Sequence, residues 1–171
     1  MSGRYMISYD LPPGRFNLRA AAIVPREGHV LIHRSTVDPF WTLPGGRVEW
    51  GESTCATVER EIEEELGVTA TVGGLAAVVE NFFTYAGQRC HELAYYFTVH
   101  LPDEFPFQTD GSICHRCRDG SAELEFKWIP ITAQALDVHA FVPAILRDRL
   151  PALSDVVEHL VFHEEVEGPT G

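Results

Sequence analysis

The chain has 171 residues, a formal net charge of −12 and a mean hydropathy of −0.05, and 45% of its residues are hydrophobic. That size and composition fit one soluble globular domain with its own core. The negative charge argues against binding to nucleic acid polymers, and no apolar run is long enough to span a membrane. Residues 1–18 lack a signal peptide's apolar core, so we expect a cytoplasmic protein with reduced cysteines.

The first part of the chain predicts an arm followed by two strands. Residues 1–15 are polar and rich in turn formers, which predicts an arm over the surface. Residues 16–24 are apolar except for Arg19, and they predict a strand buried on both sides. Arg19 forms either a salt bridge at the edge of the core or a contact with substrate. The turn at 25–28 precedes a second strand at 29–34, and we expect the two strands to form a hairpin.

Residues 45–68 read GGRVEWGESTCATVEREIEEELGV and predict a glycine turn, a short loop and an acidic helix. An N-cap at Ser53 or Thr54 and a left-handed C-cap at Gly67 place the helix at about 54–66. Three residues form its apolar stripe: Val58, Ile62 and Leu66.

Three carboxylates share one face of this helix, because Glu61, Glu64 and Glu65 stand at positions i, i+3 and i+4. Glu52, just before the helix, can fold back toward that face. Such close negative charges repel one another, and a hard divalent cation such as Mg²⁺ or Mn²⁺ would remove that cost. Arg60 is placed to orient one glutamate by a bidentate contact. Composition alone favours the alternative of a solvated acidic face.

Residues 46–68 match the Nudix box, Gly-x5-Glu-x7-Arg-Glu-U-x-Glu-Glu-x-Gly-U with U aliphatic, at every defined position. The preceding residues 41–45, WTLPG, are similar to the run that commonly leads into this box. The chain therefore resembles the Nudix hydrolases. That resemblance implies an α/β fold in which a mixed β-sheet lies between helices, an α/β/α sandwich. It also implies metal-dependent hydrolysis of a nucleoside diphosphate linked to a moiety X.

The resemblance implies roles for single residues. The expected metal ligands are four side chains and a backbone carbonyl of the glycine turn: Glu52, Glu61, Glu64, Glu65, and Gly46 or Gly45. Arg60 would hold the box geometry. The general base would be Glu64, Glu61 or a later glutamate. Arg34, at the end of its strand, resembles an arginine that meets the substrate's phosphates, although a surface position is the alternative.

Residues 68–101 predict strands broken at 73–74 and turned at 86–88. Tyr85 resembles a tyrosine of Nudix enzymes that cleave dinucleoside polyphosphates, although such an aromatic is more often part of a core. Three further aromatic side chains could stack on the substrate's base, although a place in the core is again the alternative: Trp50, Phe82 and Phe83.

Residues 102–121 lack periodicity and predict a long loop that serves as a lid or a dimer contact. Cys114 and Cys117 form a CxxC in this stretch. One such pair is weak evidence for zinc, because a structural site needs four ligands. The residues that would have to complete the site are Cys90, His91 and His115, and we expect ordinary thiols instead.

Residues 123–130 alternate as a strand that ends beside Trp128. Many Nudix proteins place a glutamate just before this tryptophan, as a metal ligand or base. Glu123 is the first candidate for that role, and Glu125 is the second. Residues 132–150 predict a helix that Pro143 either begins or breaks.

Residues 153–162 predict another helix, which completes one Nudix domain at 16–165. An arm at 1–15 and a tail at 166–171 flank that domain. X is open among nucleoside triphosphates, nucleotide sugars and dinucleoside polyphosphates, and a homodimer is left open. The other function classes are a nucleotide-sensing module without hydrolysis and an interaction protein that only keeps the fold. The four intact box glutamates favour hydrolysis.

Overall fold

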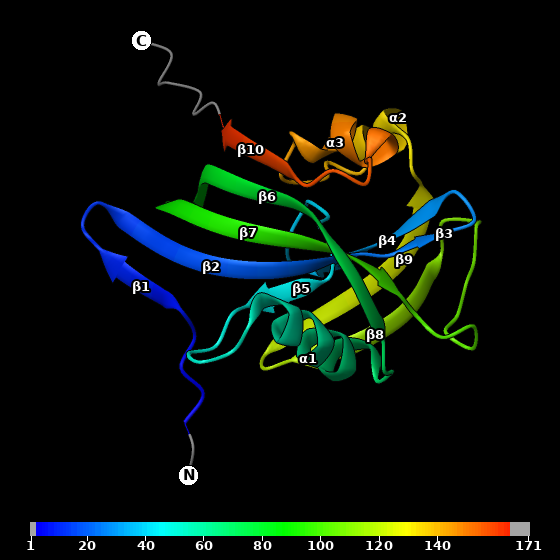
Figure 1. The fold of residues 1–171 in the computed structure, drawn as a ribbon, viewed down its shortest axis with the longest axis horizontal. Helices are drawn as coiled ribbons and strands as arrows, with labels where there is room; N and C mark the ends of the chain where they lie inside the picture. Colours follow the sequence, from blue (N-terminus) through cyan, green and yellow to red (C-terminus); the bar gives the residue numbers. More distant parts are fainter. Residues whose placement is uncertain (1–2, 165–171) are drawn as a thin grey trace.

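The computed structural model describes residues 3–164, and its strands form two β-sheets that lie between helices (Figure 1). The larger sheet has the order β1-β2-β7-β6-β10, with β5 paired to β2. Its strands are β1 (Ser8–Leu11), β2 (Gly14–Ile23), β5 (Gly45–Arg47), β6 (Thr71–Tyr85), β7 (Gln88–His100) and β10 (Glu158–His163). The smaller sheet, in the order β3-β4-β9-β8, contains β3 (Pro25–Arg26), β4 (His29–Ser35), β8 (Ile113–Asp119) and β9 (Ala122–Pro130).

The helices cover opposite sides of the sheets. Helix α1 (Thr54–Leu66) lies on one side, and α2 (Ala133–Val138) and α3 (Leu146–Arg149) lie on the other, with a 3₁₀ turn at Leu150–Ala152 (Figure 1). Each side has its own buried apolar cluster. The arrangement confirms the predicted α/β/α sandwich.

Strand alternation supplies both clusters. In β4, Leu31 packs into the cluster under α1, while Ile32 packs into the cluster under α2 and α3. Three fully buried side chains from α1 and β9 anchor the first cluster: Ile62, Phe126 and Trp128. The apolar stripe predicted for α1 is confirmed, since its three residues all belong to this cluster.

The predictions for the N-terminal arm and for the first hairpin were partly wrong. Residues 8–11 form β1, which pairs antiparallel with β2. Strand β2 pairs parallel with β7 rather than with β4. The hairpin partner of β4 is the short strand β3, because the chain bends at Val24 and passes from one sheet to the other.

Four later expectations also need correction. The loop predicted at 102–121 contains β8, which carries the CxxC and forms one edge of the smaller sheet. The break at 73–74 is an irregularity in the pairing of β6 with β7 within one strand. The helix predicted at 132–150 is divided into α2 and α3. Residues 153–162 form no helix; β10 begins at Glu158 and pairs parallel with β6. The predicted tail at 166–171 lies outside the described residues.

Candidate active site

Helix α1 begins and ends as its sequence predicts. Ser53 is the N-cap, and its side chain accepts a hydrogen bond from the backbone N–H of Ala56. Gly67 is the C-cap with φ of 69°, and its N–H donates to the carbonyl of Glu63. These caps set the bounds of the helix at Thr54–Leu66.

The two glycines of β5 allow unusually close packing. An added Cβ at Gly45 would lie 2.3 Å from the carbonyl oxygen of Ala20. An added Cβ at Gly46 would lie 2.1 Å from Oε1 of Glu61. The Glu61 carboxylate therefore packs directly against the backbone of Gly46, which brings together two of the predicted ligand groups.

Arg60 connects the loop before α1 to the helix. Its Nε and Nη2 donate to the two carboxylate oxygens of Glu52 at 2.9 and 3.0 Å, and its Nη1 donates to Oε1 of Glu61 at 2.7 Å. Glu52 also accepts from Oγ1 of Thr57 at 2.7 Å and from the N–H of Glu49 at 3.1 Å. Burial favours a higher pKa for Glu52, but the hydrogen bonds from Arg60 and Thr57 outweigh it and lower that pKa to about 2. Glu52 is thus an ionised brace, and its role as a ligand stays a prediction.

Glu61 and Glu65 are the buried carboxylates of α1, with 9% and 5% of their surface exposed. Burial raises the pKa of Glu61, although Arg60 opposes that shift. Burial also raises the pKa of Glu65 well above its ordinary value, and the nearby charge of Glu61 adds to the effect. Oε2 of Glu65 is buried without a hydrogen bond within the described residues. Its neighbour, Nδ1 of His33, is 3.6 Å away, and burial lowers the pKa of His33 to about 3, which leaves this imidazole neutral.

Glu64 is the exposed member of the set. It accepts hydrogen bonds from Arg4 and from Nη1 of Arg60, the latter at 3.4 Å, and the contact with Arg4 lowers its pKa. Arg4 also pairs with Oε1 of Glu49 at 3.1 Å. Sequence reasoning missed Arg4, because it stands far from the box in the chain and carries no motif.

These carboxylates suit a hard divalent cation in chemistry but are held by arginines in this structure. Among residues 3–164, no three His, Cys, Asp or Glu side chains form a ready-made metal site. Oε2 of Glu65, which has no hydrogen bond within residues 3–164, and the Glu61 carboxylate that packs on Gly46 nevertheless offer oxygen donors to a cation. The residues therefore fit Mg²⁺ or Mn²⁺ if the arginine contacts to Glu61 and Glu64 rearrange.

A second group of polar residues lies on the opposite face of the smaller sheet. Nε and Nη2 of Arg34 donate to Oε1 of Glu125 at 2.9 and 2.7 Å, and the guanidinium lies 4.6 Å from the ring of Trp41. Nζ of Lys127 lies 4.5 Å from the same ring. Arg34 is thus half-buried and stacked rather than a free surface residue.

Glu123 and Glu125 point away from α1. Their neighbours Leu124 and Phe126 pack in the cluster under α1, so alternation directs the two glutamates to the other face. Glu123 is exposed, whereas Glu125 is buried and also lies 3.6 Å from Arg116. The structure does not bring Glu123 to the box carboxylates, so its role as base or ligand stays a prediction.

The remaining predicted residues lie around the loop that leads into the box. Nη2 of Arg19 donates to the carbonyl of Leu43 at 3.2 Å. Tyr85, at the tip of the β6–β7 hairpin, donates its hydroxyl to Oδ1 of Asp38 at 3.1 Å. Neither contact tests the proposed substrate roles. In the described part of the chain the CxxC belongs to no group of three His, Cys, Asp or Glu side chains that could hold a metal ion, and the four cysteines are free. No described helix has the length and apolar character needed to cross a membrane.

Comparisons with known proteins place these features in a family. A family model for the NUDIX domain matches residues 16–148. The CTP pyrophosphohydrolase of Escherichia coli strain K12 is 39% identical over 61 residues, which cover 33% of this chain and 45% of that protein. Each of four curated relatives is matched over less than half of its own length.

Solved structures show the same fold. A NUDIX hydrolase from Nitrosomonas europaea aligns with a TM-score of 0.60 at 19% identity, over 86% of this chain and 79% of that one. A MutT NUDIX hydrolase from Burkholderia pseudomallei aligns with a TM-score of 0.52 at 27% identity, over 68% and 84% of the two chains.

Proposed function

The chain belongs to the Nudix family, and from that premise we propose that it hydrolyses a pyrophosphate linkage in a nucleoside diphosphate joined to a further moiety X. The observation that carries the proposal is the pair of buried carboxylates on α1. Glu61 packs on Gly46, and one oxygen of Glu65 has no hydrogen-bond partner in the described part of the chain. Burying such groups is unfavourable unless a cation or a hydrogen bond compensates them.

Glu61, Glu64 and Glu65 would hold Mg²⁺ or Mn²⁺, with the Gly46 carbonyl as a further oxygen donor. When bound, such an ion supplies positive charge for the diphosphate and increases the acidity of water. Arg60 keeps Glu52 and Glu61 in register through its hydrogen bonds. Glu52 acts through Arg60 and Thr57 as a positioning residue.

A glutamate must take the proton of the attacking water. Glu64 is our first choice, because it is exposed and ionised, whereas the raised pKa of Glu61 favours its protonated form when no metal is bound. Arg34 would bind the phosphates from its position on Trp41, exchanging part of its contact with Glu125 for a bidentate contact to phosphate.

Nucleoside triphosphates are the first substrate class to examine, because the relative from Escherichia coli is named as a CTP pyrophosphohydrolase. Nucleotide sugars and dinucleoside polyphosphates form the rest of the panel. Tyr85 and its bond to Asp38 belong to the dinucleoside hypothesis, since they place an aromatic ring beside the loop before the box.

The test is hydrolysis of this panel with Mg²⁺ or Mn²⁺, with products identified by mass spectrometry. We expect one class to be cleaved, and the Glu64→Gln, Glu65→Gln double variant to lose at least about 10²-fold of the turnover. Glu63→Gln, an exposed neighbour on the same helix, is the matched control. Full activity of the double variant would refute the assigned roles. Nucleotide binding without turnover of any substrate would favour the sensing module.

A further inference from the structure

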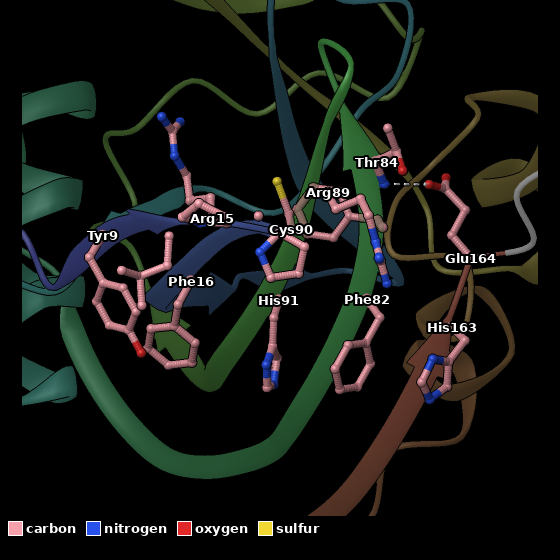
Figure 2. A pocket seen from close by; sticks show the side chains of 15 residues that line it. Tyr9, Arg15, Phe16, Phe82, Thr84, Arg89, Cys90, His91, His163 and Glu164 are labelled. Carbon is pink, nitrogen blue, oxygen red and sulfur yellow. Dashed lines mark hydrogen bonds between the residues drawn. The ribbon is translucent and has the colours of Figure 1, made fainter.

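A row of aromatic side chains crosses the larger sheet away from the box. The five rings stand at paired register positions on five neighbouring strands: Tyr9, Phe16, His91, Phe82 and His163 on β1, β2, β7, β6 and β10. Figure 2 shows them side by side with their rings directed to the same side of the sheet. We call this set the aromatic row.

The rings contact one another along the whole row. Ring centroids of Phe82 lie 4.3 Å from His91 and 4.4 Å from His163, both stacked. Phe16 meets His91 edge-on at 5.4 Å and Tyr9 in a stack at 5.3 Å. Cross-strand ring pairs stabilise a sheet, which accounts for their presence. It does not account for their exposure, since Tyr9 is 52% exposed and both histidines are exposed.

The aromatic row lies on the α1 side of the sheet but beyond the helix. Alternation along β2 places three residues on the same face as Phe16: Leu18, Ala20 and Ala22. All three pack in the cluster under α1. Ala20 pairs with Gly46 of the box. Phe16 and Ala20 are four residue steps apart along the strand, a distance of about 13 Å. The row is therefore a neighbour of the candidate active site and not a part of it.

A hollow of about 480 Å³ is lined by the five residues of the row, by Arg89 and by Glu164, which accepts from the N–H of Thr84 at 3.3 Å. Arg15 also borders it, but its side chain is directed away from the rings (Figure 2). This volume suits a small molecule, for which sites of about 300–1,000 Å³ are usual. Asp10 neutralises Arg15 through two hydrogen bonds of 2.7 and 3.1 Å. Arg89 is exposed and forms no ion pair among residues 3–164, in a chain whose net charge is −12.

We propose that this hollow is a second binding site for a planar aromatic anion of the size of a nucleoside monophosphate. The face of the ligand's aromatic ring packs against the outward ring edges of the row, because neighbouring rings cover much of one another's faces. Every nucleobase can be accepted, because each has a π-face. The phosphate pairs with the guanidinium of Arg89, which has no ion-pair partner in the described part of the chain. The proposal does not depend on the hydrolytic function, since none of its residues belongs to the box.

The test is binding of adenosine 5′-monophosphate to the whole chain at pH 7.5 in EDTA, followed by calorimetry and by amide shifts in ¹H–¹⁵N spectra. We expect shifts at residues 82–91 and 159–163, and weaker binding of adenosine or inorganic phosphate alone. His91→Ala and Arg89→Ala should each weaken binding about tenfold or more. His100→Ala and Arg118→Ala, which replace exposed residues elsewhere on β7 and β8, should leave it unchanged.

Three outcomes would overturn the proposal. The first is no binding at millimolar ligand, which would leave the row with a role in sheet stability alone. The second is a set of shifts confined to residues 44–65, which would place the ligand at the box. The third is equal binding of adenosine and adenosine 5′-monophosphate with no effect of Arg89→Ala, which would remove the anionic part of the assignment. Because metal and turnover play no part in the assay, the second site can fail this test without the proposed hydrolysis failing.

Discussion

At the scale of single residues, the geometry of the candidate active site depends on a few positions, at which either a missing side chain or a particular side chain is required. Gly46 is the clearest case, because Glu61 occupies the space that a Cβ would fill. Glu52 is the second, because its two oxygens accept from Arg60, Thr57 and the backbone at Glu49. Each of these two residues gives a prediction about how the site is held in place, separate from the binding of a metal.

Gly46→Ala should displace the Glu61 carboxylate. A methyl group there would lie 2.1 Å from Oε1, so the carboxylate must move, and a shift of about 1 Å can cost about 10²-fold in rate. We also expect a loss of about 1–3 kcal/mol in the free energy of unfolding. Turnover and urea unfolding measure the two effects. Gly74→Ala is the matched control, because an added Cβ at Gly74 meets nothing within 4 Å. Equal activity of the two variants would contradict the close packing.

The Glu52 brace should make stability depend on pH in the acid range. Its pKa is about 2 in the folded chain, against an ordinary value of 4.5. A lowered folded-state pKa stabilises the protein above pH 4.5, and this stabilisation is lost as the pH falls through about 2. Glu52→Gln should therefore lower the free energy of unfolding by about 1–3 kcal/mol at neutral pH. The gap from the wild type should narrow from pH 5 to pH 3 in urea titrations, and a gap that stays constant would exclude the brace.

At the scale of elements, the box helix was predictable and two edge strands were not. The sequence of α1 contains its own caps, stripe and spacing, so its bounds at Thr54–Leu66 follow from local physics. The apolar residues of 153–162 fit a helix as well as a strand. Their pairing with β6 makes residues 158–163 the strand β10. Strand β8 is an edge strand whose alternation is weak, and only its pairing with β9 shows that the CxxC is not in a loop.

The candidate site was likewise predictable only where its residues are close in sequence. The contacts of Arg60 with Glu52 and Glu61 follow from the spacing of the box. The contact of Arg4 with Glu64 requires residues 5–7 to run along the box loop. Those residues do so through hydrogen bonds from Ile7 N–H to the Val48 carbonyl and from Trp50 N–H to the Tyr5 carbonyl, each of 2.7 Å. No local sequence pattern predicts such a pairing.

This N-terminal segment should compete with metal at Glu64. Arg4→Ala removes a cation that pairs with Glu64 and Glu49, so we expect Mn²⁺ to bind about 2–5 times more tightly. Electron paramagnetic resonance of free Mn²⁺ measures the affinity directly. Arg15→Ala, another paired arginine near the N-terminus, is the control. An unchanged or weaker Mn²⁺ affinity in Arg4→Ala would show that Arg4 does not hold Glu64 against the metal.

At the scale of the whole molecule, the site lies where α1 packs on both sheets. Helix α1 contacts β2 and β5 of the larger sheet and β8 of the smaller one. Nε2 of His115 on β8 lies 2.8 Å from the backbone carbonyl of Glu65. Parallel pairing of β2 with β7 joins distant parts of the chain in the larger sheet, so the sheet order is a property that composition and periodicity do not contain. The helix that carries the carboxylates is therefore held by both sheets.

Removing the charge of Glu65 should stabilise the metal-free protein and abolish its response to metal. Glu65 is buried, its Oε2 has no hydrogen bond within the described chain, and it lies near the charge of Glu61. Glu65→Gln keeps the shape and removes the burial cost of a carboxylate, so the midpoint of thermal unfolding in EDTA should rise by about 2–8 °C. In the wild type, Mg²⁺ should raise the midpoint by binding only the folded state.

In Glu65→Gln, Mg²⁺ should leave the midpoint nearly unchanged, while Glu63→Gln, at an exposed position of the same helix, should respond as the wild type does. Calorimetric scans with EDTA and with Mg²⁺ give all of these values. A lower midpoint of Glu65→Gln in EDTA would mean that the carboxylate is satisfied without metal. A full response of that variant to Mg²⁺ would place the ion elsewhere. Loss of the response together with a gain in metal-free stability is the result expected of a residue whose burial is compensated by a bound cation.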